Sequence, residues 1–204
     1  MASEPAEPVV PLVGLTGGMG AGKSTALAAL QRLGAAVLST DAVVHDLYAH
    51  DADLRDAVLA RWGPEVAPDG VVDRAAVARH AFAQESERHW LEGLLWPLVG
   101  ARVAAWLQAA RARRPAPPAA VVEVPLLFEA GMEGLYDATI AVVADEHLRA
   151  ERAAGRGHAL ADERTARQLS QEEKARRATY TVRNNRGERE LEEDLSGILG
   201  KLKG

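Results

Sequence analysis

A glycine-rich stretch near the N-terminus constrains the fold more than any other part of the chain. It reads Gly17-Gly18-Met19-Gly20-Ala21-Gly22-Lys23-Ser24 and fits the pattern G-x-x-x-x-G-K-[ST]. An apolar run over 9–15 precedes it, and leucines at helical spacing follow it as far as Gly34. A strand that turns through glycines into a helix can direct several backbone N–H groups at phosphate oxygens. The stretch therefore predicts a phosphate-binding loop, rather than a glycine-rich turn that contains a lysine by chance.

The residues at the end of this loop have separate expected roles. Lys23 is expected to reach the terminal phosphates of a nucleotide, and the hydroxyl of Ser24 to hold Mg²⁺. The helix that begins here adds a partial positive charge of about half an elementary charge at its N-terminus. The loop and helix together predict a nucleotide site with Mg²⁺ as its cofactor.

Further apolar runs alternate with helical patterns along the chain. The runs that we interpret as strands after the first cover 35–39, 119–124, 139–143 and 179–182. This alternation predicts an α/β fold, a three-layer sandwich whose five-stranded parallel sheet has helices on both faces. Ligands bind such sheets beyond the carboxyl ends of the strands.

The spacing of these elements predicts a single phosphate-loop domain with two helical insertions. The core is expected to consist of 9–44, 119–144 and 178–204. A helical subdomain is expected over about 45–115, before the prolines at 115, 117 and 118. The charged, helix-patterned segment 145–177 is expected to form a lid over the site.

Composition and charge exclude several classes of protein. The chain of 204 residues has a formal net charge of −5, which argues against a surface organised around duplex nucleic acid. It contains no cysteine, so disulfides, thiolate metal sites and cysteine nucleophiles are excluded. No apolar run is long enough for a membrane span, and no signal peptide is apparent. We therefore expect no nucleic-acid or membrane partner, a cytoplasmic location, and a monomer or small homo-oligomer.

Asp41 is the candidate catalytic base. It directly follows the second expected strand, so it should emerge at the same edge of the sheet as the loop. Phosphoryl transfer to a hydroxyl needs a carboxylate that orients the nucleophile and takes its proton. The alternative is that Asp41 only caps the helix that follows, as many such aspartates do.

Arginines in the expected lid are a second indication of phosphoryl transfer. Arg149, Arg152 and Arg156 recur at spacings of three and four, which places them on one helical face. Arginines so placed can meet a transferring phosphoryl group when a lid closes. The alternative is a solvated helix with intrahelical pairs to neighbouring acidic residues.

The order of several segments resembles the dephospho-CoA kinase family. The segments that carry the resemblance are 14–25, Asp41, Gly70, Asp73, Arg74, Phe82, Leu91, Glu92, Pro97, 124–129, Arg152, Arg156, Arg164, Gln168, Lys174 and Asn184. The resemblance implies transfer of the γ-phosphoryl group of ATP to the ribose 3′-hydroxyl of dephospho-CoA, which gives coenzyme A and ADP.

The resemblance also implies that the helical subdomain over about 45–115 binds the acceptor, and it implies a set of site residues. ATP would be bound by Gly17, Gly18, Gly20, Ala21, Gly22, Lys23, Ser24, Thr25 and Arg156, and the acceptor by Asp41, Arg74 and Leu126. Asp41, Lys23 and Arg152 would be catalytic, and Ser24 would be the metal ligand.

The chain departs from the family pattern at two places. Trp96 stands where the family usually has histidine, and Ser39 and Thr40 replace the first two residues of an Asp-Ala-Asp signature that Asp41 completes. Trp96 lies in an apolar run, so we expect it to pack in the core, although its ring could also stack on an adenine.

Two other functions remain as alternatives. One is a P-loop kinase with a different small-molecule or nucleotide acceptor. The other is a nucleotide-binding switch, but a GTPase of that kind needs an Asn-Lys-x-Asp segment, and the sequence contains no Asn-Lys pair.

Overall fold

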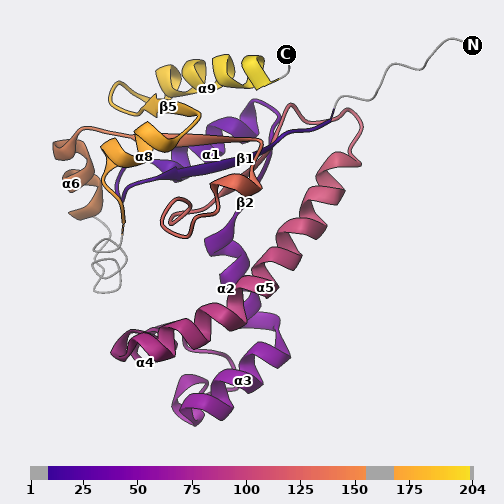
Figure 1. Ribbon diagram of the computed structural model, residues 1–204, viewed down its shortest axis with the longest axis vertical. Coiled ribbons are helices and arrows are strands. Elements are labelled where there is room, and N and C mark those ends of the chain that lie inside the picture. Colours follow the sequence, from indigo (N-terminus) through magenta and orange to yellow (C-terminus); the bar gives the residue numbers. More distant parts are fainter. Residues whose placement is uncertain (1–8, 155–167, 203–204) are drawn as a thin grey trace, which may run out of the picture. The chain divides into compact units, whose positions relative to one another are not determined.

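The computed structural model describes residues 9–154 and 168–202 (Figure 1). These residues fall into two compact units. The sheet unit contains the described residues of Met1–Leu38 and Leu107–Gly204, and the helical unit contains Ser39–Trp106.

The sheet has five strands in the order β2-β3-β1-β4-β5. Their bounds are Leu12–Gly17 for β1, Ala36–Ser39 for β2, Ala120–Glu123 for β3, Ala138–Val143 for β4 and Tyr180–Arg183 for β5. The pairings of β1 with β3, β1 with β4 and β4 with β5 are parallel, which confirms the predicted α/β fold with its five-stranded parallel sheet. β1 starts three residues later than the apolar run predicted, after Pro11, which has no N–H to donate to a ladder.

Helices connect these strands. Their bounds are Lys23–Arg32 for α1, Thr40–His50 for α2, Ala52–Trp62 for α3, Arg74–Ala83 for α4, Glu85–Arg111 for α5, Glu146–Ala154 for α6, Gln171–Arg177 for α8 and Glu188–Leu202 for α9. Short 3₁₀ turns cover Pro64–Val66 and Glu133–Leu135. The chain leaves α1 through Gly34, whose φ of 89° is the left-handed conformation expected of a glycine that ends a helix.

Helices α1 and α9 cover one face of the sheet. Val13 and Leu15 of β1 and Ile140 of β4 are buried among residues of these helices, including Leu30 and Leu195. Side chains alternate along a strand, so Gly14 and Thr16 belong to the other face.

The other face of the sheet is covered by the segment after β3 and by α8. A Cβ on Gly14 would lie 2.5 Å from Leu127 and 3.1 Å from Tyr136, and Thr16 lies beside Lys174 of α8. Because both faces carry layers, the sheet unit is the predicted three-layer sandwich.

In the helical unit, the carboxylate of Glu87 in α5 binds two neighbouring residues at the end of α3. It accepts hydrogen bonds from Arg61 at 2.6 Å and from the Trp62 indole at 2.7 Å. Trp62 also stacks on His80 of α4, with ring centroids 5.5 Å apart, and meets the ring of Trp90 edge-on. This cluster connects α3, α4 and α5.

Trp96 of α5 does not pack in the core, so that prediction was wrong. Its exposed fraction is 58%, whereas Leu91 on the same helix is buried. Five residues along an α-helix turn the chain by about 140°, which places Trp96 well away from the face that contains Leu91.

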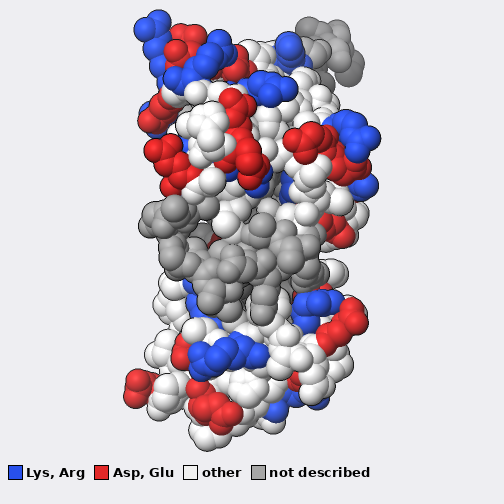
Figure 2. All heavy atoms as spheres, turned by 90° about the vertical axis from the view of Figure 1, so that its left-hand side faces the viewer, with Lys and Arg blue, Asp and Glu red and all other residues white. Residues whose placement is uncertain are grey.

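The described surface is mixed in charge. On the face shown in Figure 2, Lys and Arg are interspersed with Asp and Glu, and no broad basic area gathers among the described residues visible there. None of the helices in 9–154 and 168–202 combines the length and apolar character needed to cross a membrane.

The cluster around Glu87 predicts a change of stability with pH. The hydrogen bond from Arg61, followed by that from Trp62, lowers the pKa of Glu87 from its usual 4.5 to about 2. A carboxyl group whose pKa is lower in the folded state stabilises it above the unfolded pKa, and loses this effect as pH falls toward the folded pKa. We expect Glu87→Gln to lower the melting temperature at neutral pH, and the difference from wild type to shrink as pH falls from 4.5 toward 2.

Thermal unfolding followed by circular dichroism at several pH values measures this difference. Asp69→Asn, which alters an exposed carboxylate outside the cluster, is the control and should follow the wild type throughout. A deficit for Glu87→Gln that stays constant through the acid range would contradict the prediction.

Candidate active site

The phosphate loop joins the carboxyl end of β1 to the N-terminus of α1. Two of its residues, Gly20 and Gly22, have φ values of 73° and 95°, in the left-handed region that disfavours side chains. Gly17 has no space for a Cβ, which would lie 2.5 Å from the carbonyl oxygen of Val142. Glycines are therefore required here both by backbone conformation and by close packing.

The first half of the loop has its carbonyl oxygens bound by two basic side chains. Lys23 Nζ donates to the carbonyls of Gly17 at 3.0 Å and Gly18 at 3.2 Å. Arg149 Nε, from α6, donates to the carbonyl of Met19 at 2.9 Å. The Arg149 guanidinium also pairs with Glu146 at 2.7 Å, so the expected intrahelical pair and the contact to the loop coexist.

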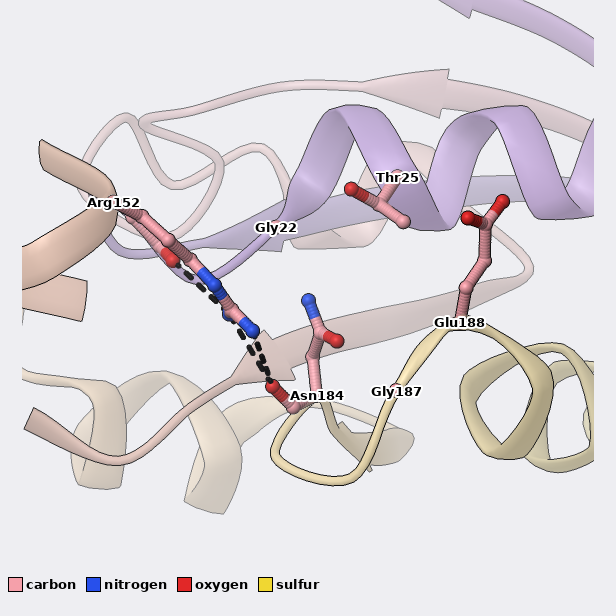
Figure 3. Close-up of a pocket in the computed structure, with 7 residues that line it drawn as sticks. Gly22, Thr25, Arg152, Asn184, Gly187 and Glu188 are labelled. Carbon is pink, nitrogen blue, oxygen red and sulfur yellow. Dashed lines mark hydrogen bonds between the residues drawn. The ribbon is translucent and has the colours of Figure 1, made fainter. Parts of the chain in front are cut away.

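The second half of the loop is held in the same way. Arg152 Nη1 lies 3.5 Å from the carbonyl of Gly20, and both terminal nitrogens of Arg152 donate to the carbonyl of Asn184 at 3.2 Å (Figure 3). Asn184 Nδ2 donates to the carbonyl of Ala21 at 3.0 Å.

These contacts determine where the amides of the loop point. In a planar trans peptide the N–H group points away from the C=O group. Because the carbonyls of 17–21 accept from these side chains, the N–H groups that follow Gly17, Gly18, Met19 and Ala21 point away from the donors. A phosphate bound by the loop would need several of these N–H groups on its own side.

A pocket of about 280 Å³ opens beside the loop. Its lining consists of Gly20, Gly22, Thr25, Arg152, Asn184, Gly187 and Glu188. In Figure 3 the side chains of Asn184 and Glu188 point toward α1, which carries Thr25. The pocket therefore combines guanidinium, amide, carboxylate and hydroxyl groups with the second half of the phosphate loop.

Gly187 and Glu188 were not among the residues predicted from the sequence. They follow β5, the strand at one end of the sheet order. The rule that ligands bind beyond the carboxyl ends of strands would have indicated this segment, but their residue types carry no nucleotide-binding pattern.

Several of the predicted site residues lie in the sheet unit. Lys23, Ser24 and Thr25 begin α1, with Ser24 exposed, and Arg152 reaches the loop from α6. Leu126 is half-buried in the turn after β3. Arg156 lies outside the described residues.

Asp41 and Arg74 belong to the helical unit. The alternative that Asp41 only caps a helix does not hold, because α2 begins at Thr40 and Ser39 occupies the N-cap position. Asp41 is instead an exposed residue of the first helical turn, where a negative charge is favoured by the helix dipole. Arg74 begins α4 and donates to His45 Nδ1 at 3.0 Å.

The residues present suit Mg²⁺ held jointly with a nucleotide. No group of three or more His, Asp or Glu residues able to hold a metal occurs in the part of the chain that the structure describes. Mg²⁺ typically takes one or two protein oxygens and completes its shell with phosphates and water. The exposed hydroxyl of Ser24, beside the loop, fits that pattern.

The contact between Gly22 and Asn184 predicts a selective loss of nucleotide binding. A Cβ on Gly22 would lie 2.0 Å from Asn184 Nδ2, whereas a Cβ on Gly34, at a similar φ of 89°, would meet only Pro118 at 3.9 Å. Alanine in the left-handed conformation costs about 1–2 kcal/mol at either site. We expect Gly22→Ala to abolish ATP binding and Gly34→Ala to retain it.

Calorimetric titration with ATP and magnesium, beside melting temperatures for both variants, measures this difference. Equal ATP affinity in the two variants would contradict a requirement for the close approach of Asn184 to the loop.

Comparison with known proteins identifies the family. The family model described as dephospho-CoA kinase matches residues 11–190. A dephospho-CoA kinase of Deinococcus radiodurans is 38% identical over 202 residues, covering 97% of this chain and 96% of that protein. One of Symbiobacterium thermophilum is 38% identical over 180 residues, covering 86% and 74%. A Thermus thermophilus crystal structure, 33% identical, matches with a TM-score of 0.79 and covers 96% of this chain and 100% of that one. The chain therefore belongs to the dephospho-CoA kinase family.

Proposed function

We propose that this protein transfers the γ-phosphoryl group of ATP to the ribose 3′-hydroxyl of dephospho-CoA, producing coenzyme A and ADP. Membership of the family indicates the reaction. The observation that supports it in the structure is the phosphate loop, whose carbonyl oxygens are bound by Lys23, Arg149, Arg152 and Asn184.

ATP would place its phosphates on the loop and its base in the adjoining pocket. The amide of Asn184 and the carboxylate of Glu188 supply acceptors for an exocyclic amino group, and the amide also supplies a donor. Lys23 and Arg152 would then contact phosphate oxygens in addition to, or in place of, the backbone carbonyls. Such an exchange is favourable because a hydrogen bond between two charged groups is stronger than one to a neutral carbonyl.

Asp41 would act as the general base. Its carboxylate would accept the proton of the 3′-hydroxyl while the ribose oxygen forms a bond to the γ-phosphorus, and the bond to the ADP oxygen breaks. When bound, Mg²⁺ supplies positive charge that neutralises the β- and γ-phosphates. Ser24 would hold it, and Lys23 and Arg152 would stabilise the remaining charge of the transferred group.

Other assignments stay predictions. Arg74 and Leu126 would bind the acceptor, and Arg156 would contact ATP. The exposed ring of Trp96 is available to stack on an adenine, as one interpretation of the sequence allows. The cytoplasmic location and the monomeric or small oligomeric state are likewise proposed.

The proposed base can be tested with Asp41→Asn, which removes the charge and keeps the shape. We expect kcat to fall by about 10²–10⁴-fold, the usual contribution of a general base, with little change in melting temperature. An ADP-release assay with ATP and dephospho-CoA measures the rate, and Asp46→Asn, an exposed aspartate of the same helix, serves as the control. Turnover close to wild type in a folded Asp41→Asn protein would remove Asp41 from this role.

The acceptor and the nucleotide site can be tested together. Wild-type protein should consume ATP with dephospho-CoA and not with nucleoside monophosphates or shikimate, whereas Lys23→Ala should lose turnover and keep its fold. Lys201→Ala, in α9, is the matched lysine control. Preference for another acceptor would favour the alternative of a different small-molecule kinase, and normal turnover by Lys23→Ala would reject the nucleotide site.

A further inference from the structure

Lys174 of α8 is a lysine with an exposed fraction of 0%. Its Nζ lies 2.8 Å from Glu129 Oε1, donates to the carbonyl of Pro125 at 2.8 Å and lies 3.4 Å from Thr16 Oγ1. An ammonium group has three hydrogens to donate, so these partners account for its full capacity. One buried cation thus connects α8, the segment after β3 and the end of β1.

The negative charge of Glu129 is compensated by this lysine. Its side chain is 11% exposed, and Oε1 also accepts from the backbone N–H of Leu169 at 2.8 Å. Among the described residues, Oε2 is buried and has no hydrogen-bond partner. Burial lowers the pKa of Lys174, and Glu129 opposes that shift. Loss of either partner would leave the other charge buried without its counterion.

The position of the pair links it to the nucleotide site. Thr16 is the last residue before Gly17, where the phosphate loop begins, and its hydroxyl also donates to the carbonyl of Pro125 at 3.3 Å. Thr16 is itself fully buried. The Lys174 ammonium and the Pro125 carbonyl therefore hold the residue that leads into the loop, on the face of the sheet opposite α1.

Stability alone is a weak reason for such a pair. Replacing a buried ion pair by apolar side chains of similar volume is often neutral or stabilising, because the desolvation of both charges is removed. A pair that also positions a neighbouring backbone segment has a second effect, and apolar side chains in its place would not reproduce that effect.

We propose that Lys174 is a positioning residue for the phosphate loop, which it fixes through Thr16 and Pro125, with Glu129 as its counterion. The proposal rests on the nucleotide site assigned above. It assigns Lys174 no contact with substrate. Its effect should therefore appear in ATP affinity, which does not depend on the identity of the acceptor.

The test uses Lys174→Met, Glu129→Gln and the double variant in the full-length protein, with melting temperature and the Kd of ATP with magnesium measured for each. The single variants should lower both stability and affinity. In the double variant the unpaired charges are gone, so melting temperature should recover. The Kd should nevertheless stay raised about ten- to hundredfold, the range seen when a residue that orients a ligand-binding group is removed. Recovery of wild-type affinity together with stability would reduce the pair to a structural role and overturn the proposal.

Two further variants keep the test decisive if Lys174→Met fails to fold. Thr16→Val removes only the hydroxyl that joins the pair to the loop, and should raise the Kd of ATP while the ion pair remains. Leu195→Ala, in the core between α1 and α9, should lower the melting temperature without changing the Kd. An unchanged Kd for Thr16→Val, or an equal rise for Leu195→Ala, would overturn the proposal.

The outcome is separable from that of the proposed reaction. A wild-type protein that binds ATP but does not phosphorylate dephospho-CoA would reject the reaction and leave the Kd comparison intact. A wild-type protein that binds no ATP would overturn both.

Discussion

The hydrogen bonds that hold the carbonyl oxygens of the phosphate loop are the constraint on which the site depends. A run rich in glycine has many conformations open to it and few side chains to restrict them. Lys23, Arg149, Arg152 and Asn184 supply that restriction from outside the loop. Because these carbonyls are engaged before ATP binds, the loop has less conformational entropy to lose on binding.

The order of the strands explains why these donors can meet the loop. β1 lies in the middle of the sheet, and β4 and β5 follow it on one side. Since the pairings are parallel, their carboxyl ends share one edge. α6, with its arginines, begins just after β4, and Asn184 comes directly after β5. Parallel pairing thus delivers side chains distant in sequence to the same few ångströms around a single turn.

Sequence patterns predicted the elements well and their partners less well. Apolar runs located all five strands, and Gly34 marked the end of α1, because burial and backbone conformation leave local signals. Asp41 stands two positions after Ser39, the N-cap of α2, so the capping alternative does not hold. Trp96 was predicted to lie in the core because periodicity does not show which helical face finds a partner. The ion pair of Glu129 and Lys174 was not anticipated, since a contact between residues 45 positions apart has no local signature.

The central place of β1 in the sheet also bears on the order in which the protein can assemble. Its pairing partners, β3 and β4, follow more than 100 residues later, and the contact of Asn184 with Ala21 spans 163 residues. Ordering so long a chain must precede such contacts, which makes them late events in folding. As the polypeptide leaves the ribosome, the glycine motif emerges well before β4 and Asn184, so it can reach its folded conformation only after these later segments have been made. A product truncated before Asn184 would therefore carry the whole motif without the amide that holds the carbonyl of Ala21.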